Sequence, residues 1–98
     1  MRISDKKISF IGLGKLGLGL ALSISDSGIK VIGIDNNKKI INKLKSKKLP
    51  IFEPGLGSLL KKNINSNFFV TQDKFSAIEQ SDVTYILIQT PSKKNGRF

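Results

Sequence analysis

The feature of this sequence that most limits its fold is a set of closely spaced glycines between two apolar segments. Residues 8–11 form a short run of apolar and β-prone residues, which is typical of a buried strand. Residues 15–27 carry apolar side chains over much of a helical surface, so a helix here would be largely buried. The segment therefore predicts a strand, a tight turn and a helix, with the turn formed by Gly12, Gly14 and Gly17.

Further along the chain, apolar and polar segments alternate in the same way. Strand-like runs lie at residues 31–34, 68–71 and 83–89, and short helices are expected near residues 56–60 and 75–80. Strands that alternate with helices favour a parallel sheet, because parallel neighbours need crossover connections. Three of the strands are near-continuous apolar runs, which predicts that both faces of the sheet are covered. We expect an α/β fold, a Rossmann-type parallel sheet with flanking helices and strand order 3-2-1-4.

The formal net charge of +10 arises largely from one lysine-rich stretch at residues 38–48. Ile40, Ile41 and Leu44 have helical spacing within it, which predicts an amphipathic helix with a basic outer face, capped by Asn36 or Asn37. A phosphate-rich partner and a simple solvated face would both account for these lysines. Aromatic residues do not alternate with them, so the base-stacking surface of a single-strand binder is missing. We expect a solvated face and no nucleic-acid partner.

Composition excludes several kinds of chemistry. The sequence has no cysteine and no histidine, so disulfides, thiolate metal sites and the commonest general base are absent from it. No apolar run approaches the length of a membrane span, and we expect no membrane partner. The opening residues include an early acid and no following apolar run, which argues against a secretory signal. We expect a cytoplasmic protein without a metal site or catalytic residues of its own.

The glycine segment, residues 12–17, also points to a ligand. It has the G-x-G-x-x-G spacing, follows a strand, opens a helix, and a second strand ends in an acid 18 residues after Gly17. In such a turn the first glycine permits the tight bend, the second lets the backbone approach a diphosphate, and the third lets helix and strand pack closely. The helix N-terminus then offers free N–H groups to the phosphates. The predicted cofactor-binding residues here are Gly12, Leu13, Gly14, Lys15, Leu16 and Gly17.

The acid that ends the second strand is Asp35, and two interpretations of it stay open. It would accept hydrogen bonds from the adenosine ribose, or it would cap the helix that follows, and both roles are compatible. A carboxylate there repels a 2′-phosphate, which favours NAD over NADP, although Lys38 and Lys39 lie near enough in sequence to neutralise part of that repulsion.

Two further glycines interrupt apolar elements at a cost in stability. Gly33 lies in the second strand, where the choice is between packing against a neighbour and clearance for the adenosine; packing is the preferred interpretation. Gly19 lies inside the first helix and predicts a close approach by a ligand or a strand.

The order of these segments resembles the UDP-glucose and GDP-mannose dehydrogenases, the nucleotide-sugar 6-dehydrogenases. Residues 12–21 are similar to the family's GLGYVGLPLA stretch, and residues 31–35 to the strand and acid that follow it. More distinctive blocks come in the family's order over essentially the whole chain: Pro50-Ile51-Phe52-Glu53-Pro54-Gly55-Leu56, Val70-Thr71-Gln72-Asp73, Ser81-Asp82-Val83 and Thr90-Pro91-Ser92.

The resemblance implies NAD as cofactor and a two-step oxidation of a nucleotide sugar's primary alcohol to a carboxylate. UDP-glucose, UDP-N-acetylmannosamine and GDP-mannose are the substrates of that family, and polysaccharide biosynthesis is the setting it implies. It also implies that the glycine turn, Asp35 and the segment ending in Thr90, Pro91 and Ser92 contact NAD. The alternative for the last three is a simple turn that ends a strand.

Departures from the family pattern limit the expectation. Lys15 stands where tyrosine is common, Gly19 where proline is common, and Ile40 where a basic residue is common. The cysteine that forms the family's thioester, its catalytic lysine and its sugar-nucleotide pocket match no part of this sequence. We expect residues 1–98 to be the N-terminal part of an NAD-binding Rossmann domain that is not catalytically competent alone, and that meets a nucleotide sugar only in the full-length enzyme.

Two other classes of function remain as alternatives. One is a stand-alone module that senses NAD(H) without catalysis, and the other is a basic nucleic-acid-binding domain that uses the lysine-rich helix. Exposed strand edges on an incomplete sheet would also make a homo-oligomer unsurprising.

Overall fold

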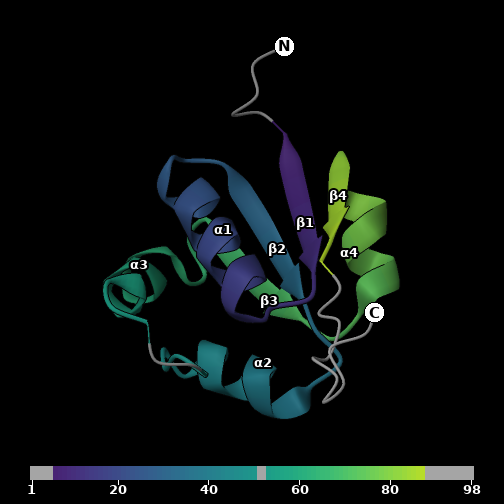
Figure 1. Cartoon of the computed structure of the whole chain (residues 1–98). Coiled ribbons are helices and arrows are strands. Elements are labelled where there is room, and N and C mark those ends of the chain that lie inside the picture. The colour runs from purple at the N-terminus through teal and green to yellow at the C-terminus, as the bar shows by residue number, and fades with distance from the viewer. Residues whose placement is uncertain (1–5, 51–52, 88–98) are drawn as a thin grey trace, which may run out of the picture.

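A computed structural model describes residues 6–50 and 53–87 and contains a four-stranded parallel sheet with four helices (Figure 1). The strands follow the order β3-β2-β1-β4 across the sheet, which confirms the predicted Rossmann-type topology. The strands are β1 (Lys7–Ile11), β2 (Lys30–Ile34), β3 (Phe68–Thr71) and β4 (Val83–Ile86). The helices are α1 (Lys15–Asp26), α2 (Lys38–Lys45), α3 (Leu56–Asn63) and α4 (Lys74–Gln80).

The connections explain how the helices divide between the two faces. From β1 to β2 the chain moves in one direction across the sheet. From β3 to β4 it moves in the opposite direction, past β2 and β1. Right-handed crossovers then require α1 and α4 to lie on opposite faces. In Figure 1, α1 crosses in front of the sheet and α4 lies behind it. All four strands run parallel, so their carboxyl ends meet at one edge.

The main core lies between the sheet and α1. Its buried side chains come from alternate positions of the strands and from the inner faces of α1, α2 and α3. The predicted amphipathic α2 places Ile41 and Leu44 in this core, with Asn37 as its cap: the Asn37 Oδ1 accepts hydrogen bonds from the amides of Lys39 (2.9 Å) and Ile40 (3.4 Å). The core consists mainly of Ile8, Phe10, Leu18, Ala21, Leu22, Val31, Ile41, Leu44, Leu60 and Phe68.

Gly33 lies in β2 because that position has no room for a side chain. A Cβ built there would lie 2.9 Å from a methyl carbon of Leu13 and 3.1 Å from the ring of Phe68. The packing interpretation of this glycine is therefore confirmed. Gly19 differs: a Cβ there meets no described atom within 4 Å. Of the two expected neighbours, a described strand is therefore wrong, and a ligand stays a prediction.

β4 is less covered than its apolar sequence predicts. Val83, Tyr85 and Ile86 are 41%, 49% and 62% exposed, although the ring of Tyr85 stacks on Phe10 at 5.2 Å between centroids. The reason is that β4 is an edge strand in the described part of the chain, while α1 packs over β1, β2 and β3. The expectation that both faces of this strand are covered is wrong here, and residues 88 and 89 of the predicted strand lie outside the described residues.

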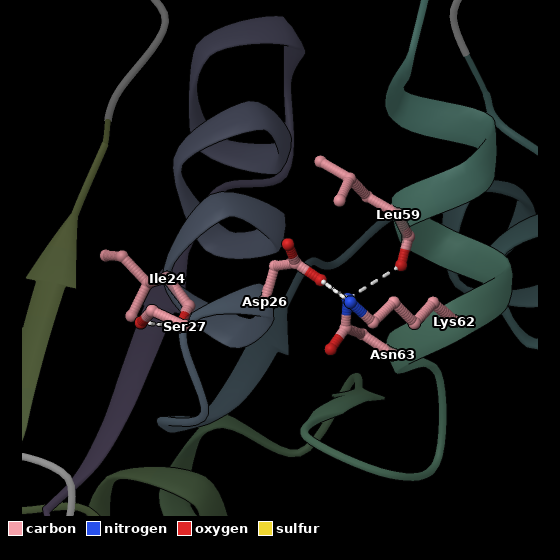
Figure 2. Close-up of polar contacts among 6 residues, drawn as sticks. All are labelled: Ile24, Asp26, Ser27, Leu59, Lys62 and Asn63. Carbon is pink, nitrogen blue, oxygen red and sulfur yellow. Dashed lines mark hydrogen bonds and ion pairs between the residues drawn. The ribbon is translucent and has the colours of Figure 1, made fainter.

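A polar cluster joins the C-terminal ends of α1 and α3 (Figure 2). The buried Asn63 side chain donates from Nδ2 to the Asp26 carboxylate (3.2 Å) and to the Leu59 carbonyl oxygen (3.0 Å), and the Lys62 ammonium pairs with the same Asp26 oxygen at 3.0 Å. These contacts, that of Lys62 first, hold the pKa of Asp26 below its ordinary value of 3.8. The cluster fixes α3, and with it the loop that precedes α3, against α1.

Within the described residues the longest helix is α1, with 12 residues, and none is long and apolar enough to cross a bilayer.

Replacing Asp26 with Asn should make the melting temperature depend less on pH in the acidic range. Because folding lowers the pKa of Asp26, its contribution to stability is complete above a pH of about 3.8 and is lost as the pH falls through the folded-state pKa. We expect Asp26→Asn to lower the melting temperature near neutral pH, with the difference from wild type shrinking below pH 4. Circular dichroism melts across this range measure it, with Glu79→Gln on α4 as a charge-matched control. Equal melting temperatures for Asp26→Asn and wild type near neutral pH would contradict the role of the cluster.

Gly33→Ala should destabilise the fold by about 1–3 kcal/mol, because the added methyl group must displace Leu13 or Phe68 in a filled core. Gly57→Ala in α3 is the matched control, since its Cβ would lie 3.9 Å from the nearest atom, a methyl carbon of Leu49. Urea unfolding of the two variants compares them directly. A Gly33→Ala protein as stable as the control would show that the core at this point is loosely filled.

Candidate functional site

The glycine turn lies at the carboxyl edge of the sheet, between β1 and α1. Gly12 has φ +103°, a left-handed conformation that favours glycine, while its amide still donates to the Ile34 carbonyl oxygen of β2 at 2.8 Å. A Cβ on Gly12 would overlap the carbonyl oxygen of Leu87. The predicted tight bend out of the strand is therefore present, and it leaves no space for a side chain.

The third glycine brings α1 close to that bend. Gly17 is buried in the first turn of α1, and a Cβ there would overlap the carbonyl oxygen of Gly12. The close packing of helix on strand predicted for this position is confirmed. It sets the N-terminus of α1 directly beside the end of β1.

Gly14 is the N-cap of α1 and has no side chain to occupy the space ahead of the helix. Its carbonyl oxygen accepts the first helical hydrogen bond, from the Leu18 amide at 2.8 Å. The amides at the start of a helix have no acceptor within the helix, and the helix dipole adds positive potential at the same place. The arrangement can hold an anion on backbone N–H groups.

Asp35 follows β2 and lies at the same edge as the glycine turn. One of its carboxylate oxygens accepts the Leu13 amide at 2.9 Å, and the other accepts the Asn37 amide at 2.8 Å. Asn37, not Asp35, caps α2, so the helix-cap interpretation of Asp35 is wrong. The partly buried carboxylate instead links the glycine turn to the start of α2.

Lys15 and Leu16 begin α1 and are both exposed. The Lys15 ammonium lies 3.5 Å from the carboxylate of Glu53, across a hollow of about 560 Å³. With the Lys15 side chain 71% exposed, this ion pair contributes little to stability. The hollow separates α1 from the loop before α3 and is lined chiefly by Lys15, Leu16, Gly19, Leu20, Glu53 and Pro54.

Sequence reasoning did not single out two of these contacts. The sequence marks Glu53 only as part of a loop and of a family block, and its pairing with Lys15 joins residues 38 positions apart. The bond between Asp35 and the Leu13 amide has no sequence signal, because any residue but proline supplies that amide.

Thr90, Pro91 and Ser92, which were also predicted to contact the cofactor, lie outside the described residues. The last described residue before them is Leu87, whose amide donates to the Ile11 carbonyl oxygen at 2.8 Å. The described chain thus leads to the same edge of the sheet as the glycine turn.

A second hollow, of about 440 Å³, lies on the face that carries α4. Lys7 and Lys30 line it, and they begin β1 and β2, so they stand at the far end of those strands from Gly12 and Asp35. The Lys30 ammonium lies 5.9 Å from the centre of the Phe69 ring. The described residues contain no group of three histidine, cysteine or acidic side chains that could hold a metal ion.

Comparison with known proteins gives a consistent result. Residues 6–98 match the model of the UDP-glucose/GDP-mannose dehydrogenase family, NAD binding domain. UDP-glucose 6-dehydrogenase TuaD of Bacillus subtilis is 40% identical over 92 residues, which are 93% of this chain and 20% of that protein. GDP-mannose 6-dehydrogenase of Pseudomonas putida is 43% identical over 91 residues, 92% of this chain and 21% of that protein.

A solved structure agrees with these sequences. The crystal structure of a ternary complex of GDP-mannose dehydrogenase from Pseudomonas aeruginosa superposes with a TM-score of 0.85 at 41% identity, covering 92% of this chain and 21% of that one. The chain spans about a fifth of the length of the relatives it matches. Since the family model covers nearly every residue, and the sheet order and glycine turn fit it, the chain belongs to the UDP-glucose/GDP-mannose dehydrogenase family, within the part that matches its NAD binding domain.

Proposed function

We propose that this chain holds the adenosine diphosphate half of NAD, as the N-terminal part (residues 1–98) of the NAD-binding domain of a nucleotide-sugar 6-dehydrogenase. One observation carries the proposal: the N-terminus of α1, where Gly14 has no side chain, lies beside the Asp35 carboxylate at the carboxyl edge of the sheet. The hydrogen bond from the Leu13 amide to Asp35 joins the two. Ligands of open α/β sheets bind outside this edge.

The glycine turn is proposed to hold the diphosphate. The absence of side chains at Gly12 and Gly17 lets α1 start close to β1, so that its first amides face the space outside the sheet edge. Lys15 is exposed beside these amides and carries a positive charge that a diphosphate would attract. The residues proposed to contact the diphosphate and its surroundings are Gly12, Leu13, Gly14, Lys15, Leu16 and Gly17.

Asp35 is proposed to accept hydrogen bonds from the adenosine ribose. A carboxylate can accept about four hydrogen bonds, and the amides of Leu13 and Asn37 use two of them. The same charge disfavours a 2′-phosphate, which supports NAD over NADP. Thr90, Pro91 and Ser92 are proposed to complete the cofactor contacts, because they follow a strand that pairs in parallel with β1.

In the parent enzyme, oxidation of the sugar's primary alcohol to a carboxylate would remove two hydrides and take up one water, so it would consume two molecules of NAD in turn. The chain contributes the binding and orientation of the cofactor, and none of its residues is assigned a catalytic role. A nucleotide sugar of the UDP-glucose, UDP-N-acetylmannosamine or GDP-mannose class is the proposed substrate, on the strength of relatives that carry those names. Uronates from such a reaction would serve polysaccharide biosynthesis in the cytoplasm. An exposed strand edge of the sheet is the proposed contact for a homo-oligomer.

Gly17→Ala should weaken NAD binding by about tenfold or more, a loss of about 1.4 kcal/mol, because the methyl group would push α1 away from Gly12. Gly19→Ala, two positions along the same helix, is the matched control: its Cβ meets no described atom, and alanine favours a helix by up to about 1 kcal/mol. Fluorescence titration with NADH measures both. Wild-type protein that fails to bind NADH would refute the proposal, and equal loss in both variants would refute the role of the glycine turn.

The wild-type chain should prefer NAD to NADP by about tenfold or more, through repulsion between Asp35 and the 2′-phosphate. In Asp35→Ala this preference should shrink, and raising the salt concentration should shrink it in wild type. Competition of NAD and NADP against bound NADH measures the ratio. Equal affinity for the two cofactors in wild type would mean that Lys38 and Lys39 cancel the charge of Asp35.

A further inference from the structure

We infer that Asp35 positions the glycine turn before any cofactor binds, so that one carboxylate both shapes the diphosphate site and meets the ribose. The inference rests on the function proposed above and adds a role to one residue of that site. It starts from the bond of 2.9 Å between the Leu13 amide and the Asp35 carboxylate.

The bond acts at the middle of the turn. Gly12 has a left-handed conformation and Gly14 is the N-cap of α1, so Leu13 is the residue between the bend and the helix. The orientation of the peptide before Leu13 sets the direction in which the chain enters α1. A hydrogen bond to that peptide therefore controls where the first amides of α1 point.

Three contacts tie this short stretch to β2 and its end. The Gly12 amide donates to the Ile34 carbonyl oxygen at 2.8 Å, and the Leu13 amide donates to Asp35. The Leu13 side chain is only 1% exposed and packs over Gly33, where a Cβ would lie 2.9 Å from one of its methyl carbons. Of the two hydrogen bonds, the one to Asp35 is the one whose acceptor is a side chain.

The carboxylate is itself held in place. Its other oxygen accepts the Asn37 amide at 2.8 Å, and the Asp35 amide donates to the Thr71 carbonyl oxygen of β3 at 3.3 Å. Asp35 is therefore fixed by the start of α2 and by the sheet, and can act as a rigid acceptor for Leu13. Ribose hydroxyls would use the lone pairs that remain.

The two roles of Asp35 predict different responses to a nucleotide without ribose hydroxyls. If Asp35 only binds the ribose hydroxyls, removing its carboxylate breaks no hydrogen bond to 2′,3′-dideoxy-ADP, because this probe has no such hydroxyls. Removing a negative charge would then strengthen the binding of an anionic diphosphate. If Asp35 also positions the turn, its removal weakens the binding of this probe, against the electrostatic trend.

The experiment compares ADP and 2′,3′-dideoxy-ADP by NMR titration of the 98-residue chain and of Asp35→Ala. We expect Asp35→Ala to weaken the binding of both nucleotides, by about fivefold or more for the dideoxy probe. Asp35→Asn keeps an oxygen that can accept the Leu13 amide, so it should restore part of the dideoxy-ADP affinity.

Asp82→Ala is the matched control. It removes the same charge and also a carboxylate that accepts a backbone amide, that of Lys7 at 2.8 Å, but at the start of β1. Its affinity for both nucleotides should stay within about twofold of wild type.

Amide hydrogen exchange without nucleotide gives an independent reading. The Leu13 amide should exchange about tenfold faster in Asp35→Ala than in wild type and unchanged in Asp82→Ala, with the amide of Leu22 in the middle of α1 as a reference for global unfolding. If Asp35→Ala does not fold, the nucleotide titration and the amide exchange are both measured on Asp35→Asn instead.

The outcomes separate the two proposals. Wild-type protein that binds neither nucleotide overturns the proposed function, whatever the exchange of Leu13. If wild-type protein binds ADP and Asp35→Ala binds dideoxy-ADP as tightly as wild type or more tightly, only the positioning role is overturned.

Discussion

The close approach of α1 to the end of β1 is the constraint on which the rest of this structure depends. Gly17 faces the carbonyl oxygen of Gly12 at a distance that no side chain allows, so the helix begins directly above the strand. From that start, α1 lies over β1 and β2 and buries Leu18, Ala21 and Leu22 against the sheet. A larger residue at position 17 would move the helix and with it both the core and the candidate site.

The site joins elements that the chain keeps apart. Leu13 belongs to the first crossover, Asp35 follows the second strand, and one hydrogen bond brings them together. On the other side of α1, Asn63 and Lys62 of α3 bind Asp26. The loop before α3 places Glu53 beside Lys15. The positive end of α1 thus has a carboxylate on each flank, one in the proposed ribose site and one beside an exposed hollow.

Most of the fold could be predicted from local patterns. The spacing of Ile40, Ile41 and Leu44 within residues 38–48 predicted an amphipathic helix, and α2 buries Ile41 and Leu44 and partly buries Ile40. The short apolar runs predicted β1, β2 and β3, because these patterns reflect which face each element buries. β4 shows where this reasoning fails. Its apolar sequence predicted burial, but exposure depends on which elements pack over a strand, and in the described part of the chain β4 is at the edge.

The sequence by itself determined the glycine turn, the acid after the second strand and the family to which they belong, because glycine spacing and apolar alternation act over a few residues. Only the tertiary structure decided what the glycines and the acid touch. Gly33 makes room for Leu13, Gly19 faces open space, and Asp35 binds a backbone amide 22 residues away rather than capping α2. Such contacts arise when crossovers bring distant segments to one edge of the sheet, and a backbone amide looks the same in every residue but proline.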